Sequence, residues 1–141
     1  MPENEQKQEE LERVDLETAI RRKVISRDRR YDLNAYRFIY EALEFTQSLY
    51  ERDPESEDPV DRHVSGQELL EGIRAFATQE FGPLAAVVFR SWGVQKTEDF
   101  GEIVFNLVEA ELMGRTETDS RIDFADGYDF DEAFDAPVKQ T

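Results

Sequence analysis

The stretch from Ser65 to Glu111 constrains the fold more than any other part of the chain, because helical periodicity alternates there with helix-boundary signals. Ser65-Gly-Gln-Glu68 matches the capping box, in which the serine hydroxyl and the glutamate carboxylate each bind a free backbone N–H at a helix start. Apolar residues recur at helical spacing up to Gly82-Pro83, which predicts a helix end there. The segment 84–92 is apolar nearly all round, which predicts a short buried helix closed by Gly93.

The helix from Thr97 to about Glu111 has the clearest pattern. Thr97 is a good N-cap, acidic residues suit the first turn, and five apolar residues form one broad face: Phe100, Ile103, Val104, Leu107 and Val108. Two earlier helices are predicted over 13–30 and 34–49. Gly72 and Gly101 lie inside predicted helices, where glycine is unfavourable, so each predicts the close approach of another element.

The C-terminal part predicts a small β-hairpin. Residues 112–116 and 121–124 are two short runs, the second strictly alternating, and the polar spacer 117–120 separates them. The fold class expected is therefore mainly α with a small C-terminal β-hairpin (α+β). This order of elements resembles a winged helix-turn-helix domain, and another mainly helical arrangement of the same elements stays open. Aromatic and acidic residues alternate over 128–135, which predicts a tail with docked rings and solvated carboxylates.

Length and hydropathy indicate a single domain without a membrane-spanning segment. A chain of 141 residues suits a single globular domain, placed here at 13–135, between a disordered acidic tail at 1–12 and a C-terminal tail at 136–141. No signal sequence and no apolar run of membrane-spanning length is visible, so a cytoplasmic location is expected. The chain has no cysteine, which excludes disulfides and cysteine-based zinc sites.

Charge indicates the polarity of a partner. The formal net charge is −16, and only residues 13–30 are basic, with seven cations against three carboxylates. A strongly acidic surface favours a basic protein partner. The leading hypothesis is a non-enzymatic protein-interaction module that binds a basic partner through the acidic outer face of the Thr97 helix and through the acidic C-terminal tail. That candidate partner surface consists of Glu98, Asp99, Glu102, Asn106 and Glu109.

Nucleic acid binding is the alternative hypothesis. The carboxylates of the Thr97 helix would repel the phosphates that wall a DNA groove, so this helix is not expected to read DNA. The basic N-terminal helix could still bind nucleic acid as part of a regulator. Its candidate residues are Arg21, Arg22, Lys23, Arg27, Arg29 and Arg30.

No constellation of residues predicts an enzyme. His63 is the one histidine, and its neighbour Ser65 is already explained by the capping box, so a structural histidine is the favoured interpretation. Nucleophile-elbow and phosphate-loop motifs are absent, and no cofactor is expected. An EF-hand loop centred on Gly127 fails, because Ile122 and Phe124 would occupy ligand positions. A weak calcium site among the acidic residues 123–131 stays open beside a solvated tail.

Several phrases of the sequence resemble a known family. They include RHVSGQELLEGIR, FGPLA, TEDFGEIVFNLVEAELM and YDFDEAF. Together they resemble a family of small uncharacterised bacterial proteins found chiefly among planctomycetes and verrucomicrobia, over roughly residues 15–135. The resemblance implies a stand-alone bacterial domain, and it implies no activity or catalytic position.

Overall fold

The computed structural model describes Lys7 and residues 15–114 and 121–134. A helical segment at 15–20 continues into the π-helix η1. The elements that follow in the chain are helical throughout: η1 (Arg21–Ile25), α2 (Leu33–Leu49), α3 (Pro59–Arg62), α4 (Gly66–Phe81), η2 (Gly82–Leu84), α5 (Ala85–Ser91), α6 (Thr97–Glu109), η4 (Arg121–Phe124) and α7 (Phe130–Phe134).

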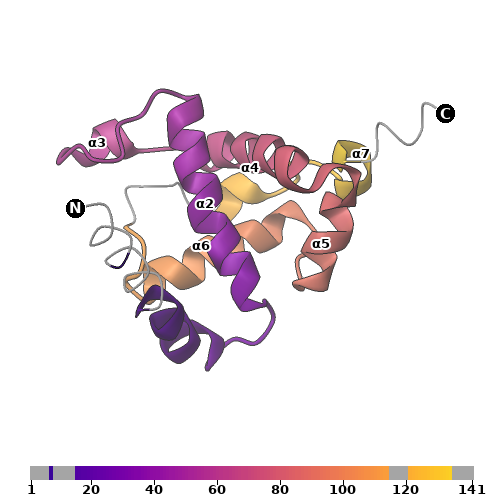
Figure 1. Ribbon diagram of the computed structural model, residues 1–141, viewed down its shortest axis with the longest axis horizontal. Helices are drawn as coiled ribbons and strands as arrows, with labels where there is room; N and C mark the ends of the chain where they lie inside the picture. The colour runs from indigo at the N-terminus through magenta and orange to yellow at the C-terminus, as the bar shows by residue number, and fades with distance from the viewer. Residues whose placement is uncertain (1–6, 8–14, 115–120, 135–141) are drawn as a thin grey trace.

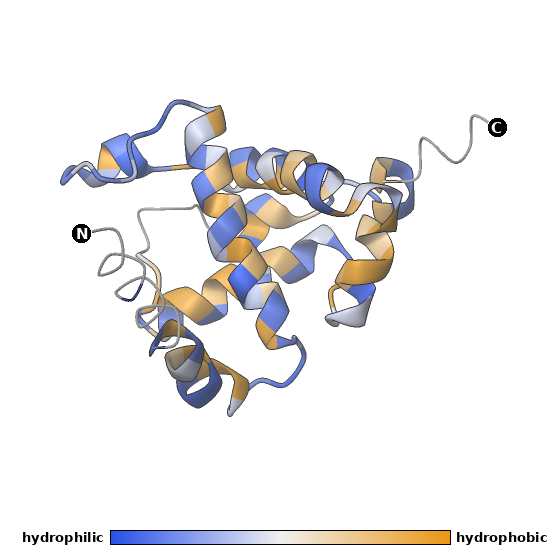
Figure 2. Cartoon of the chain, in the orientation of Figure 1, coloured by the Kyte–Doolittle hydropathy of each residue, from blue (hydrophilic) through white to orange (hydrophobic). Residues whose placement is uncertain are grey.

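Helix α2 crosses both α4 and α6, and the short helices α5 and α7 lie together at one end (Figure 1). The acidic loop before α3 (residues 52–58) and α3 itself form an arm at the opposite end, which we call the α3 arm. Hydrophobic and hydrophilic residues alternate along the helices, as the colouring of Figure 2 shows, and the buried hydrophobic residues form one core. At the α2–α4 crossing, a Cβ on Gly72 would lie 1.7 Å from the Thr46 hydroxyl oxygen. The prediction that Gly72 marks a close helix crossing is confirmed, because only a residue without a side chain fits there.

The boundary signals around α4 are confirmed. The Ser65 hydroxyl accepts the Glu68 N–H at 3.0 Å, and the Glu68 carboxylate accepts the Ser65 N–H at 3.0 Å. The helix ends at Phe81, and Gly82 follows with a φ of 56°. The next helix is less buried than predicted, because Leu84 and Val87 are 62% and 61% exposed.

Helix α6 begins at the predicted place, with a different cap. Lys96 is the N-cap residue, and the Asp99 carboxylate accepts the N–H groups of Gln95 and Lys96 at 2.8 and 3.2 Å. Thr97 is the first helical residue, and its buried hydroxyl accepts the Gly127 N–H at 3.0 Å. The hydroxyl therefore holds the C-terminal segment against α6 and does not cap the helix.

The predicted C-terminal β-hairpin is wrong. Residues 121–124 form the 3-10 helix η4, residues 112 and 113 form a bend, and the described residues contain no strand, so a winged helix has no wing there. Residues 115–120, which include the predicted turn, lie outside the described residues. The physical reason is Phe124, whose fully buried ring enters a notch that Gly66 and Gly101 leave between α4 and α6. A single tight turn is enough to place that ring in the notch. A strand at 121–124 would have no neighbouring strand to pair with among the described residues.

The N-terminal helix is shorter than the predicted 13–30. Helical structure ends at Ile25, and Ser26 begins a turn whose Asp28 carboxylate accepts the Arg30 N–H at 3.0 Å. Of the six predicted basic residues, only those up to Lys23 lie in a helix. The other three lie on the loop that leads to α2.

Aromatic rings from five elements form the part of the core beside α5. Phe89 is fully buried, and its ring centroid lies 5.1 Å from that of Phe100 and 5.7 Å from that of Phe134. The prediction of docked C-terminal rings is confirmed, since Phe130 and Phe134 are 2% and 3% exposed while the neighbouring carboxylates face solvent. Trp92, the last residue of the segment predicted to be a buried helix, is half-buried at the edge of this cluster.

The predicted domain limits are not tested by the structure. The tails at 1–12 and 136–141 lie outside the described residues, apart from Lys7. One hydrophobic core joins the elements from Ile20 to Phe134. Among the helices described, none is long and apolar enough to cross a membrane.

Candidate functional site

The outer face of α6, predicted to bind a partner, lies against other parts of the same chain. The hydroxyl of buried Tyr31 donates to the Asp99 carboxylate at 2.6 Å. The Glu102 carboxylate lies 3.6 Å from the Arg30 guanidinium and 3.1 Å from that of Arg121 in η4. Both carboxylates therefore hold neighbouring segments to α6.

The remaining residues of that face are also occupied. The Asn106 amide donates to Asp28 at 3.0 Å and to the Tyr36 hydroxyl at 3.1 Å. The Glu98 carboxylate accepts the Asp126 N–H at 3.4 Å. Glu109 is exposed, and it too has an interaction within the chain. The outer face of α6 therefore binds other segments of the chain itself.

Asp28 and Arg30 form the strongest ionic contact of this region. Their side chains meet in a fork, with nitrogen–oxygen distances of 2.7 to 3.0 Å. The hydrogen bonds from Arg30 hold the pKa of the Asp28 carboxyl well below its usual range, and Asp28 in turn raises the pKa of Arg30. Burial, followed by the bond to Asp99, raises the pKa of Tyr31. These groups therefore keep their ordinary charge at neutral pH.

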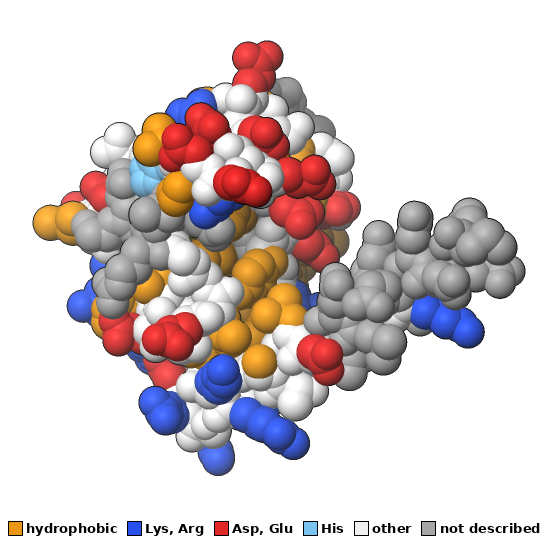
Figure 3. Space-filling model, turned by 90° about the vertical axis from the view of Figure 1, so that its left-hand side faces the viewer, with side chains coloured by type: hydrophobic (Ala, Val, Ile, Leu, Met, Phe, Trp, Pro, Cys, Tyr) orange, Lys and Arg blue, Asp and Glu red, His pale blue; other side chains and the backbone are white. Residues whose placement is uncertain are grey.

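Of the six residues of the predicted basic surface, one is paired and five have no ion-pair partner among the described residues. Arg30 is paired, whereas the other five cations are exposed, and none of them forms an ion pair within the part of the chain that the structure describes: Arg21, Arg22, Lys23, Arg27 and Arg29. Figure 3 shows basic side chains gathered over η1 at the lower end of the molecule and acidic side chains at the upper end, over the α3 arm.

A cleft of about 780 Å³ opens between η1, the start of α2 and the end of α5. We call it the arginine cleft, because five arginines line it: Arg21, Arg29, Arg30, Arg37 and Arg90. Trp92 and Asn34 also line it. The sequence pattern did not indicate Arg37 or Arg90, because each is a single cation within a predicted helix.

A second hollow of about 620 Å³ lies between α2 and the chain that leaves α6. We call it the α2 groove. Its apolar lining consists of Tyr40, Leu43, Pro54, Val108, Leu112 and Met113. Glu44 and Glu111 are its charged lining residues, and the remaining lining residues are Gln47 and Gly114. Sequence reasoning missed the groove, because its two walls are distant in the chain.

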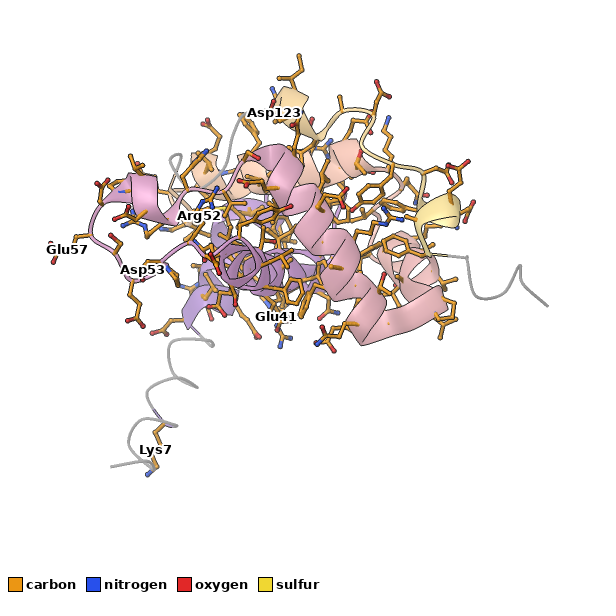
Figure 4. The ribbon with its side chains drawn as sticks, turned by 90° about the horizontal axis from the view of Figure 1, so that it is seen from above. Lys7, Glu41, Arg52, Asp53, Glu57 and Asp123 are labelled. Carbon is orange, nitrogen blue, oxygen red and sulfur yellow. The ribbon has the colours of Figure 1, made fainter. Side chains whose placement is uncertain are left out.

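The α3 arm, which supplies Pro54, adds further negative charge. Arg52 at its base donates to the Glu68 carboxylate at 3.1 Å and to the His63 carbonyl at 2.9 Å, so this cation is held against the body. Asp53 and Glu57 are exposed, and Figure 4 shows Glu57 pointing away from the molecule at the outer end of the arm. The arm therefore presents carboxylates to solvent beside the groove.

The other predicted chemical candidates have partners within the chain. His63 is half-buried and has a partner within the chain. In the predicted calcium region, Asp129 accepts the N–H groups of Asp131 and Glu132 at 2.9 and 3.1 Å, and Asp131 pairs with Arg90 at 3.0 Å. Within the described residues, no three histidines or carboxylates are grouped as a metal ion would require.

Comparisons of the chain with protein-family models, with curated proteins and with solved structures found no match. The family resemblance of residues 15–135 stays a prediction.

Proposed function

We propose that the protein is a non-enzymatic interaction module whose α2 groove binds a basic, amphipathic segment of a partner protein. The observation that supports this most strongly is the lining of the groove. Apart from two glutamates it carries no charged side chain, and six of its ten lining residues are apolar.

The floor of the groove is suited to apolar side chains of a partner. Leu43 and Met113 are nearly buried, while Tyr40, Val108 and Leu112 keep part of their surface in water. Covering such surface releases about 25 cal/mol per Å², so a partner gains affinity by inserting aliphatic or aromatic side chains. A helix that inserts anchors at helical spacing is a common way to fill such a groove.

The rim of the groove is suited to Lys and Arg side chains of a partner. Glu44 and Glu111 are exposed, and neither forms an ion pair with any residue that the structure describes. The acidic arm and the net charge of −16 extend the same polarity. A segment with Lys or Arg beside its anchors would be attracted during approach and oriented at the rim, whereas an acidic segment would be repelled.

Met113 offers a direct test, because the chain contains only one other methionine, Met1. Isotope-labelled methionine methyl groups would be observed by NMR while a model amphipathic Leu/Lys peptide of about five helical turns is added. We expect the Met113 signal to shift saturably while the Met1 signal stays in place. A Leu/Glu peptide with the same apolar pattern should leave Met113 unchanged.

Charge-reversal variants separate the groove from general attraction. Glu44→Lys with Glu111→Lys should weaken binding of the Leu/Lys peptide by about tenfold or more. Glu71→Lys with Glu80→Lys makes the same change in net charge on the exposed side of α4, and it should have a much smaller effect. Equal weakening by both pairs, or a saturable shift with the Leu/Glu peptide, would contradict the proposed function.

A further inference from the structure

The arginine cleft contains cations that differ in how firmly they are held. Arg30 is fixed by its fork with Asp28. Arg37 and Arg90 each make an ion pair with one carboxylate, at 3.3 Å to Glu17 and 3.0 Å to Asp131, with the arginine side chains 41% exposed in both. Exposed single pairs of this kind contribute little to stability, so a stronger ligand can replace them.

Two further arginines of the cleft are available without breaking any pair. Arg21 and Arg29 are exposed, and neither has an ionic partner within the described part of the chain. Of the two lining carboxylates, Glu17 is held by Arg37, and Asp32 accepts the Asn34 N–H at 2.9 Å. Five arginines against two carboxylates leave an excess of positive charge in the lining of a strongly acidic protein.

The shape of the cleft suits a compact anion. Its volume of about 780 Å³ lies within the range of small-ligand pockets. The first residues of α2, a helix of 17 residues, form part of the wall, so the positive end of that helix adds to the potential. A phosphate group offers several acceptor oxygens at once, which matches several guanidinium forks arranged around one space.

We propose that the arginine cleft is a binding site for a small phosphate-bearing ligand, such as a nucleoside diphosphate. Arg21 and Arg29 bind the phosphate oxygens directly, and Arg37 and Arg90 add to this by exchanging their exposed carboxylate partners for the ligand. Arg30 positions the wall through Asp28. This site lies apart from the α2 groove, because the two share no lining residue.

A small ligand is favoured over nucleic acid by the charge of the rest of the molecule. The net charge of −16 opposes the approach of a polyanion, whose phosphates would extend beyond the cleft. A single phosphate or diphosphate group is held entirely within the region where the arginines outnumber the carboxylates.

Trp92 lines the cleft and is the only tryptophan in the chain, so its fluorescence reports on this site. Inorganic pyrophosphate would be titrated into the full-length protein in a phosphate-free buffer, and calorimetry with adenosine diphosphate would measure the same site without relying on fluorescence. We expect saturable binding of both. Arg21→Gln with Arg29→Gln should weaken it by about tenfold or more, because two charge-assisted contacts are lost.

The matched control is Arg22→Gln with Arg27→Gln. It removes the same charge from exposed positions that do not line the cleft, so it should change the affinity by no more than about twofold. Equal weakening by both pairs would overturn the proposal, and so would calorimetry that detects neither ligand. A single-stranded oligonucleotide that binds more tightly than pyrophosphate, with both pairs equally important, would assign the surface to nucleic acid instead.

Discussion

Asp28 is the residue on which the N-terminal loop most depends. Its carboxylate receives the Arg30 fork from its own loop and the Asn106 amide from α6, so one side chain links two distant parts of the sequence. Asn106 also donates to the hydroxyl of fully buried Tyr36, which connects this link to α2. A polar contact that joins three segments fixes the position of the loop that forms one wall of the arginine cleft.

Asp28→Asn should lower the free energy of unfolding by about 1–2 kcal/mol at neutral pH, because the ion pair with Arg30 is lost and only one side-chain acceptor oxygen remains for its guanidinium. The pKa of Asp28 is depressed in the folded protein, so its stabilisation is fully present above the ordinary carboxyl pKa. It is lost as pH falls below about 4 toward the folded-state pKa. Urea unfolding at several pH values should therefore show the wild-type advantage shrinking in acid. An advantage that stays constant down to pH 2 would contradict this role.

At the scale of elements, α6 combines an apolar face toward the core with a polar face toward other segments of the chain. Tyr31, before α2, reaches Asp99, and Arg121 in η4 reaches Glu102. The Arg121 guanidinium also lies 4.0 Å from the centre of the Phe105 ring. Helix α6 is therefore enclosed on several sides, and its carboxylates contribute to the fold.

The bond between Tyr31 and Asp99 can be measured by a double-mutant cycle. Tyr31→Phe, Asp99→Asn and the double variant should give a coupling energy of about 1–2 kcal/mol, since a hydrogen bond to a charged, part-buried carboxylate is lost. Ser48→Ala, an exposed change on α2, serves as the additive control when combined with Asp99→Asn. A coupling near zero for Tyr31 and Asp99 would mean that the α6 face is free after all.

Local sequence signals identified the three longest helices, α2, α4 and α6, well and the segments around them poorly. The Ser65–Glu68 box placed the start of α4 within the chain, because both of its bonds are formed by neighbouring residues. The alternation at 121–124 resembles a strand as much as a tight turn, and the notch of Gly66 and Gly101 that receives Phe124 is formed by two distant helices. No local pattern contains that information.

The same limit applies to the candidate surfaces, because local sequence patterns do not show which distant segments pack against them. A helical wheel correctly separates the apolar and polar faces of α6, and it cannot show that Tyr31 and Arg121 cover the polar one. The exposure of Arg21 and Arg29 could be predicted from charge alone. Their meeting with Arg37 and Arg90 in one cleft depends on how η1 and α5 pack beside the start of α2.

Across the whole molecule, some carboxylates form contacts within the fold and others face solvent. Carboxylates of α6 are used in the fold, whereas those of the α3 arm and the groove rim face solvent. Basic side chains collect at the other end, as Figure 3 shows. The protein thus presents two oppositely charged surfaces, each beside its own hollow, and we propose that these bind different ligands independently.

One NMR titration tests that claim most directly. The Leu/Lys peptide is added first and pyrophosphate second, while the Met113 methyl and the Trp92 indole N–H are observed together. Independent sites predict that the peptide shifts Met113 alone and that pyrophosphate then shifts Trp92 alone, with unchanged affinity. Movement of both signals with either ligand, or of neither signal with both ligands, would contradict it.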